Sequence, residues 1–305
     1  MIPATFMRVC VSVCVVSVCM LAVNLYAENS SCGNLPSYAQ LKGALDQAVA
    51  AETSGLNLHM WATIVDRDGI VCAVAFSGTD RGSQWPGSRV ISAQKANTAN
   101  SFSLDNSANK AGSGPGFPPL ASPTGLALST ANLYYAVQPG GSLFGLQLSN
   151  PVDTGAAYKG PSSNFGSAND PLVGEKVGGV NVFGGGLALY APQKKLVGAV
   201  GLSGDTSCAD HFIAWRVRHL LDMDHLAGAY AVSGDATHPD NIVFDFVPNP
   251  FGGPDSASPS GFGHPKCLLL AILRLFLRFS RDAQRSRPGR LLSPGARCFP
   301  GTRAN

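Results

Sequence analysis

Residues 59–76, HMWATIVDRDGIVCAVAF, decide the fold class of this 305-residue chain. Residues 59–65 and 70–76 are apolar runs of strand length, and the turn-forming residues 66–69, DRDG, separate them. Two strands joined by so short a turn are antiparallel neighbours, because parallel strands need a crossover of a dozen or more residues. The stretch therefore predicts a β-hairpin.

Helical patterns lie on both sides of this hairpin. Ser37 and Gln40 have the spacing of a capping box at the start of a helix that Gly55 can close. Apolar residues at helical spacing predict a second helix over residues 88–104. Residues 105–178 then have the composition of loops, and we interpret them as a long excursion from the compact fold.

A second hairpin and a third helix follow the excursion. Residues 180–190, interrupted by glycines, and residues 196–202 predict two further strands. Ser207 and Asp210 have the spacing of another capping box, which opens a helix ending near residue 221. Hairpins alternating with helices predict an α+β fold, an antiparallel sheet flanked by helices.

The composition and charge exclude some classes of protein. Hydrophobic residues make up 45% of the chain and charged residues 13%, which is unlike an intrinsically disordered protein. Residues 28–265 carry 12 basic and 18 acidic side chains, so this body is mildly acidic. With no basic face interleaved with aromatic residues, it gives no reason to expect a nucleic-acid partner.

The N-terminal residues 1–27 are predicted to be a signal peptide. An apolar run of 15 residues, 9–23, follows Arg8, and Ala27 provides a small residue at the expected cleavage site. The run is short for a membrane span, which needs about 20 residues, although an uncleaved N-terminal anchor stays open. We therefore expect an exported protein, periplasmic or extracellular.

Five cysteines remain after such cleavage, in a compartment that permits disulfides. Any four of them allow three connectivities. Cys32 precedes the first predicted helix, which should cover the sheet containing Cys72, and Cys267 would fasten the end of the domain beside the last helix, which carries Cys208. We predict the pairs Cys32–Cys72 and Cys208–Cys267.

An ordered set of short motifs resembles the GlcG/HbpS-like family of haem-associated proteins. The first motif is AxxxA at residues 44–48, continuing through Glu52. The others are VDRDG at 65–69, KANTA at 95–99, GGV at 178–180, and VGAVGLSG at 197–204 followed by Asp210. The resemblance covers about residues 40–225 and implies a profilin-like sheet between helices, a tendency to form homo-oligomers, and haem binding by exported members, some linked to redox sensing. The excursion departs from the family pattern, so no family haem ligand is carried over.

Four residues are candidates for binding a cofactor, for which haem is the leading hypothesis. His59 and His211 are candidate axial ligands, since haem needs one or two axial donors in an apolar pocket; the alternative for each is an ordinary surface or capping histidine. The resemblance implies that Lys95 and Thr98 face inward. A buried lysine can pair with an anionic group such as a propionate, although a lysine with a solvated stem is as common. The histidine spacings predict no metal site.

Other functions are compatible with the sequence. An enzyme acting on small hydroxy-acid or aldehyde metabolites would place Lys95 and Ser203 near the chemistry, and a third hypothesis is a structural oligomer subunit. Ser203 lies one residue off a G-x-S-x-G elbow, but that elbow belongs to a parallel sheet. We favour a small planar or anionic ligand, haem first, bound in the domain formed by residues 28–265, and we predict no catalytic residues.

The last 40 residues, 266–305, form a basic tail. Four of its arginines recur at helical spacing, as in a helix on a membrane surface: Arg274, Arg278, Arg281 and Arg285. The competing explanation for its abrupt change in composition is a shift of reading frame after about Cys267, which we prefer. Membrane contact is expected only through the signal segment or through this tail.

Overall fold

The computed structural model describes residues 31–105, 107, 125–227, 229–247, 249 and 257–267. The predicted signal peptide, the tail beyond Cys267 and part of the excursion lie outside these residues. The chain divides between Cys267 and Leu268 into two units, and the description that follows concerns the first. Among the described residues, no helix has both the length and the apolar character needed to cross a membrane.

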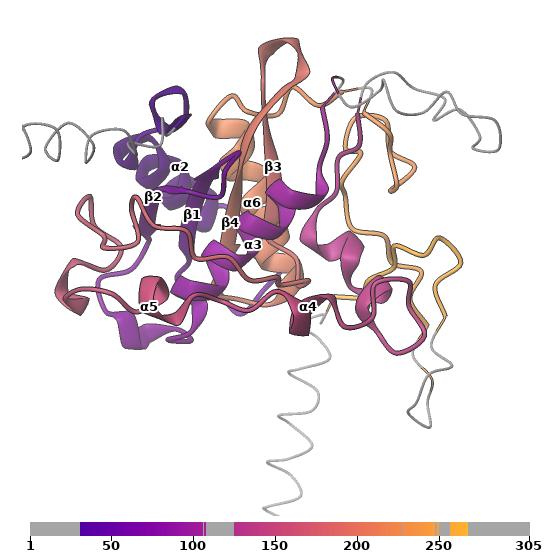
Figure 1. The fold of residues 1–305 in the computed structure, drawn as a ribbon, viewed down its shortest axis with the longest axis horizontal. Helices are drawn as coiled ribbons and strands as arrows, with labels where there is room; N and C mark the ends of the chain where they lie inside the picture. Colours follow the sequence, from indigo (N-terminus) through magenta and orange to yellow (C-terminus); the bar gives the residue numbers. More distant parts are fainter. Residues whose placement is uncertain are drawn as a thin grey trace, which may run out of the picture. The chain divides into compact units, whose positions relative to one another are not determined.

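The centre of the fold is a four-stranded antiparallel sheet with the strand order β2-β1-β4-β3 (Figure 1). The strands are β1 (Trp61–Asp66), β2 (Val71–Phe76), β3 (Gly186–Ala191) and β4 (Lys195–Ser203). Both predicted hairpins and the α+β class are confirmed. The second hairpin starts later than expected: residues 178–185 form a loop, because Gly178, Gly179 and Gly185 adopt the positive φ angles that glycine tolerates.

Helices cover both faces of the sheet (Figure 1). On one face α2 (Tyr38–Ala50) and α6 (Ser207–Leu220) pack against side chains such as Ile64 and Leu202. On the other face α3 (Ser88–Phe102) packs against Val65 and Ala199. Successive strand residues point to opposite faces, so one continuous apolar strand supplies both cores.

The helix boundaries correct two details of the sequence prediction. The capping box of Ser37 and Gln40 is present, but α2 ends at Ala50, because the Glu52 carboxylate accepts hydrogen bonds from the next two backbone N–H groups. In α6 the N-cap is Thr206, whose side chain accepts from the Ala209 N–H. Ser207 is not the cap, because its hydroxyl is bonded to the 184 and 264 segments instead.

The excursion contains short helical turns and contributes to the core. Its elements are η5 (Thr130–Leu133), η6 (Tyr135–Val137), α4 (Leu146–Ser149), α5 (Thr154–Ala157) and η7 (Ser162–Asn164). Ala157 and Leu172 are fully buried in the cluster formed by α3 and the sheet. Further short turns are η2 (Ser31–Asn34), η3 (Arg81–Ser83) and η8 (Pro192–Lys194). Part of this loop-rich segment therefore packs as core.

Both predicted disulfides are confirmed. Cys32 is bonded to Cys72, with Cα atoms 5.3 Å apart, and Cys208 is bonded to Cys267, with Cα atoms 5.7 Å apart. The first joins the segment before α2 to β2, and the second joins the start of α6 to the end of the described chain. Two disulfides fit an exported protein, since such bonds persist in oxidising compartments.

Candidate functional site

His59 lies just before β1, on the exposed side of the hairpin. Its Nδ1 atom is 3.3 Å from the Ser77 hydroxyl, and its ring meets the Phe76 ring edge-on at a centroid distance of 6.0 Å. Gly78 lies directly against the imidazole: a Cβ atom on Gly78 would be 2.8 Å from the His59 Cγ. The imidazole is thus held at the end of the first hairpin while remaining open to solvent.

A groove of about 250 Å³ begins at Gly78. The start of α2, the end of β2 and the excursion loop form its walls, which combine three aromatic rings, two cations and several hydroxyl groups: Tyr38, Phe76, Phe165, Lys42, Arg81, Thr79, Ser162, Ser163 and Ser167. Gly78 lines this groove and also lies against His59, so the imidazole is one residue away from the groove without lining it. Aromatic faces with cations at the edge suit a planar anion.

A buried ion pair holds the excursion loop against the groove. Arg89 of α3 pairs with Asp170 through two hydrogen bonds, and Asp170 also accepts from the Gly166 N–H at 2.7 Å. The Arg89 guanidinium lies 3.6 Å from the centroid of the Phe165 ring, a cation–π contact. Gly166 itself has a positive φ, and a Cβ there would lie 2.7 Å from the Cβ of Phe76.

His211 lies in a different environment from His59. It is on the inner side of α6, 2% exposed, and its Nδ1 atom has no hydrogen-bond partner among the residues that the structure describes. Burial lowers the pKa of its imidazole to about 4, so the ring is neutral at pH 7. It borders a cavity of about 160 Å³, which is smaller than the groove near His59 and too small to enclose a porphyrin.

Lys95 and Thr98 lie inside the protein, where they bind other parts of the chain. The Lys95 ammonium is 2.6 Å from the Asp210 carboxylate and 3.0 Å from the Leu202 carbonyl oxygen. Burial raises the pKa of Asp210 to about 6, and the nearby Lys95 charge opposes this rise. The Thr98 hydroxyl accepts from the Asn181 N–H at 3.0 Å and donates to the Gln94 carbonyl. Lys95 and Thr98 therefore line neither the groove near His59 nor the cavity beside His211.

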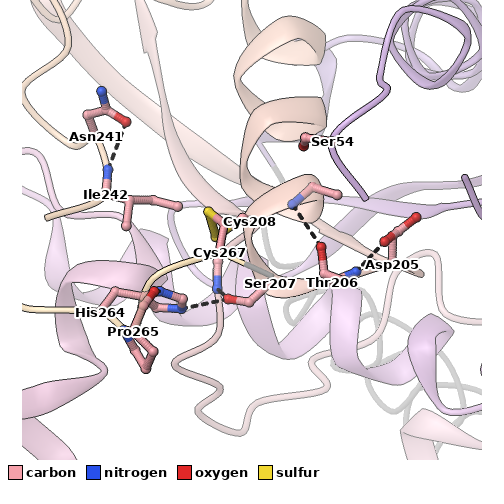
Figure 2. The surroundings of a disulfide bond; sticks show 12 residues. Ser54, Asp205, Thr206, Ser207, Cys208, Asn241, Ile242, His264, Pro265 and Cys267 are labelled. Atoms are coloured by element: carbon pink, nitrogen blue, oxygen red, sulfur yellow. Dashed lines mark hydrogen bonds between the residues drawn. A yellow bond between two sulfur atoms is a disulfide. The ribbon is translucent and has the colours of Figure 1, made fainter. Parts of the chain in front are cut away.

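Ser207 and His264, which no sequence pattern relates, form a hydrogen bond beside the disulfide (Figure 2). The His264 Nε2 atom is 2.7 Å from the Ser207 Oγ, and its Nδ1 atom is 2.7 Å from the Pro265 carbonyl oxygen. A carbonyl can only accept, so Nδ1 carries the proton and Nε2 accepts from the hydroxyl. The Gly184 N–H donates to the same hydroxyl at 2.7 Å. No sequence spacing relates these three positions.

The groove residues were also missed by sequence reasoning. Arg81 and Phe165 belong to loops without periodicity, so no pattern relates them to His59 before the chain folds. A partial signal was present in α3, where Arg89 lies one turn before the buried Ala93. An arginine at a buried helical position predicts an acidic partner, but it does not identify which one.

One group of described side chains has the spacing of metal ligands. The group consists of Cys32, Cys72 and Asp66. The two sulfur atoms and one carboxylate oxygen all lie within 4.8 Å of one another. Because the two sulfur atoms are joined as a disulfide, neither is a free thiolate.

Comparison with known proteins gives one family. The family model described as "haem degrading protein HbpS-like" matches residues 38–218. Solved structures with some similarity include Klebsiella pneumoniae protein ORFY, with 23% identity over 60% of this chain and 86% of that chain and a TM-score of 0.36. Another is a complex of PduOC with haem, with 20% identity over 64% of this chain and 99% of that chain and a TM-score of 0.38. No curated protein matches the chain.

Proposed function

The chain belongs to the family of HbpS-like haem degrading proteins, and from that premise we propose that it is an exported protein that binds haem in the groove beside His59. The family's description names haem degradation, which requires that haem first be bound. The observation that carries the proposal is the exposed His59 imidazole against Gly78, which lines a groove with three aromatic rings and two cations.

The residues at this groove fit haem in their chemistry. A histidine can hold the haem iron, which supplies the ligand's redox chemistry once bound. Arg81 is exposed and can pair with a propionate, and Lys42 supplies a second positive charge, already shared with Asp46. A groove of about 250 Å³ encloses only part of a macrocycle.

In this proposal His59 would hold the haem iron, because the other predicted site residues are less suited to that role. His211 is buried beside a cavity too small for the macrocycle. Lys95 is already neutralised by Asp210, and the Thr98 hydroxyl has two backbone partners. In this proposal Lys95 and Thr98 maintain the sheet and the 178–186 loop rather than contact the ligand.

A haemin titration of the purified full chain tests the proposal. We expect wild-type protein to shift and sharpen the Soret band, and His59→Ala to lose that change while its circular dichroism stays native. The matched control is His219→Ala, which removes an exposed imidazole from α6 and should bind like wild type. An unchanged Soret band in the wild type removes the proposal, and equal binding by His59→Ala removes the site assignment.

The cellular setting remains part of the proposal. The two disulfides support a periplasmic or extracellular location. A homo-oligomer and a redox or haem-sensing role are what the family resemblance implies. Light scattering of the purified protein, with and without haemin, gives its molar mass; a monomer in both conditions would refute the expected homo-oligomer.

A further inference from the structure

The pair formed by Ser207 and His264 is a separate feature from the groove near His59, since neither residue lines that groove. Ser207 is the first residue of α6 and follows β4 after a short turn. The Ser207 side chain is half-buried, while His264 is 4% exposed. Ser207 is thus the more accessible partner of the pair.

Hydrogen bonds and burial set the protonation state of the imidazole. The His264 Nδ1 atom donates to the Pro265 carbonyl oxygen, which leaves Nε2 as an acceptor 2.7 Å from the Ser207 Oγ (Figure 2). Burial lowers the pKa of His264 below its usual value, so the ring is neutral at pH 7. A neutral imidazole that accepts from a serine hydroxyl and is oriented through its other nitrogen has the arrangement of a general base beside a nucleophile.

Backbone N–H groups lie around the serine hydroxyl. The Gly184 N–H donates to the Ser207 Oγ at 2.7 Å, which stabilises negative charge on that oxygen as its proton leaves. Cys208 follows the serine in the first turn of α6, where backbone N–H groups have no acceptor within the helix. In hydrolases with a strand–turn–helix elbow, the residue after the nucleophile supplies an oxyanion donor. The turn from β4 into α6 gives the same local order of strand, turn, serine and helix.

Aromatic rings are close to the imidazole. The Tyr134 ring meets the His264 ring at a centroid distance of 5.2 Å, and the Phe246 and Phe183 rings lie 5.4 Å and 6.4 Å from the Tyr134 ring. Phe183 is 50% exposed and directly precedes Gly184, whose N–H reaches the serine. These rings provide an apolar surface for the aryl group of a substrate next to the general base.

We propose that Ser207 and His264 hydrolyse small aryl esters through an acyl-serine intermediate. The Ser207 Oγ attacks the acyl carbon while its proton passes to the His264 Nε2, and the bond to the phenolic oxygen breaks as this oxygen takes the proton from Nε2. Water then attacks the acyl-serine and gives a proton to Nε2, which returns it to Oγ as the carboxylic acid leaves. The sum is ester and water giving phenol and acid. This activity is additional to haem binding and uses neither His59 nor Arg81.

Hydrolysis of phenyl acetate by the purified full chain tests the inference. Ser207→Ala and His264→Ala should each lower kcat/KM by about 100-fold or more, the effect expected from losing a nucleophile or its general base. The matched controls are Ser101→Ala, at an exposed position of α3, and His219→Ala, at an exposed position of α6. Both controls should keep the wild-type rate.

Phenylmethanesulfonyl fluoride gives a readout that does not depend on the folding of a variant. It should inactivate the wild type by forming a bond between its sulfur and the Ser207 Oγ as fluoride leaves, and tandem mass spectrometry should find the group on Ser207. The inference is overturned if wild type hydrolyses the ester no faster than buffer, if Ser207 stays unmodified, or if a folded alanine variant of the pair keeps the wild-type rate. Because no haem is present in these assays, their failure leaves the proposed function untouched.

Discussion

Lys95 and Asp210 are 115 positions apart in the sequence and form an ion pair that is shielded from water on all sides. Arg89 with Asp170 and Arg218 with Asp240 are paired in the same way. Each pair connects a helix to a segment that follows later in the chain. These pairs matter to stability mainly because removing one partner leaves the other as an unpaired buried charge, which destabilises the folded protein.

Replacing one partner of such a pair should therefore be costly. We expect Lys95→Met to lower the free energy of unfolding by about 3–5 kcal/mol, because it leaves Asp210 alone in the core. The control is Lys42→Met, whose pair with Asp46 is largely exposed and should contribute no more than about 1 kcal/mol. Urea denaturation measures both. Equal losses in the two variants would show that the buried pair has no special role.

The pKa of His211 predicts a dependence of stability on pH. Its imidazole has a pKa of about 4 in the folded protein and 6.5 when unfolded, so the unfolded chain binds more protons between these values. Acidification from pH 6.5 to 4 therefore destabilises the folded state through this group, by up to about 3 kcal/mol. His211→Phe has no such group, so the stability of this variant relative to wild type should rise as the pH falls from 6.5 to 4. A constant difference between the two proteins would contradict the assignment.

The elements pack closely because small residues face each other across α3 and β4. A Cβ on Gly201 of β4 would lie 2.0 Å from the Ser92 carbonyl oxygen of α3, and the Thr63 and Ser92 hydroxyls are 2.7 Å apart. The helix therefore lies against the backbone of the strand. This close contact requires glycine at position 201 for steric reasons, without a positive φ.

Two glycine-to-alanine changes test this packing. Gly201→Ala should destabilise the protein by about 1–3 kcal/mol or more, because neither backbone can move away without disturbing the core. Gly43→Ala, in the middle of α2 with no atom near the added methyl group, should stabilise it by about 0.5–1 kcal/mol. Thermal denaturation distinguishes them. If both variants melt like wild type, the contact between α3 and β4 is looser than described.

At the scale of the whole molecule, the disulfides connect the two ends of the described chain to the sheet and its helices. Cys32–Cys72 attaches the segment before α2, and Cys208–Cys267 attaches residues 257–267, including His264, to the start of α6 (Figure 2). The second bond closes a loop of 59 residues. It limits the freedom of the unfolded chain as well as holding the folded one.

Removing this bond and removing the tail should have different consequences. Cys208→Ser with Cys267→Ser should lower the free energy of unfolding by about 2–4 kcal/mol. A chain ending at Cys267 keeps the disulfide and should lose less than about 2 kcal/mol, as expected for a tail that adds no packed core. Denaturation of both proteins under non-reducing conditions measures the difference. A larger loss on truncation would show that residues 268–305 belong to the fold.

The sequence by itself determined the two hairpins and the three long helices beside them. The hairpin 59–76, the helical spacing near residues 40 and 90, and the order of motifs were enough for the α+β class, the antiparallel sheet and the family. These features are local, because a short turn and a repeating apolar pattern depend on residues within a few positions of each other. The two disulfides followed because each cysteine's element was already placed.

Only the tertiary structure decided what surrounds each candidate site residue. His59 and His211 are both histidines beside aromatic residues in the sequence, yet one is exposed at a groove and the other is buried next to a small cavity. Arg81, Phe165 and His264 come from loops whose positions are set by contacts with distant segments. Burial, and with it the pKa and the partner of each polar group, depends on which remote chain segments pack around it, and no local pattern encodes this.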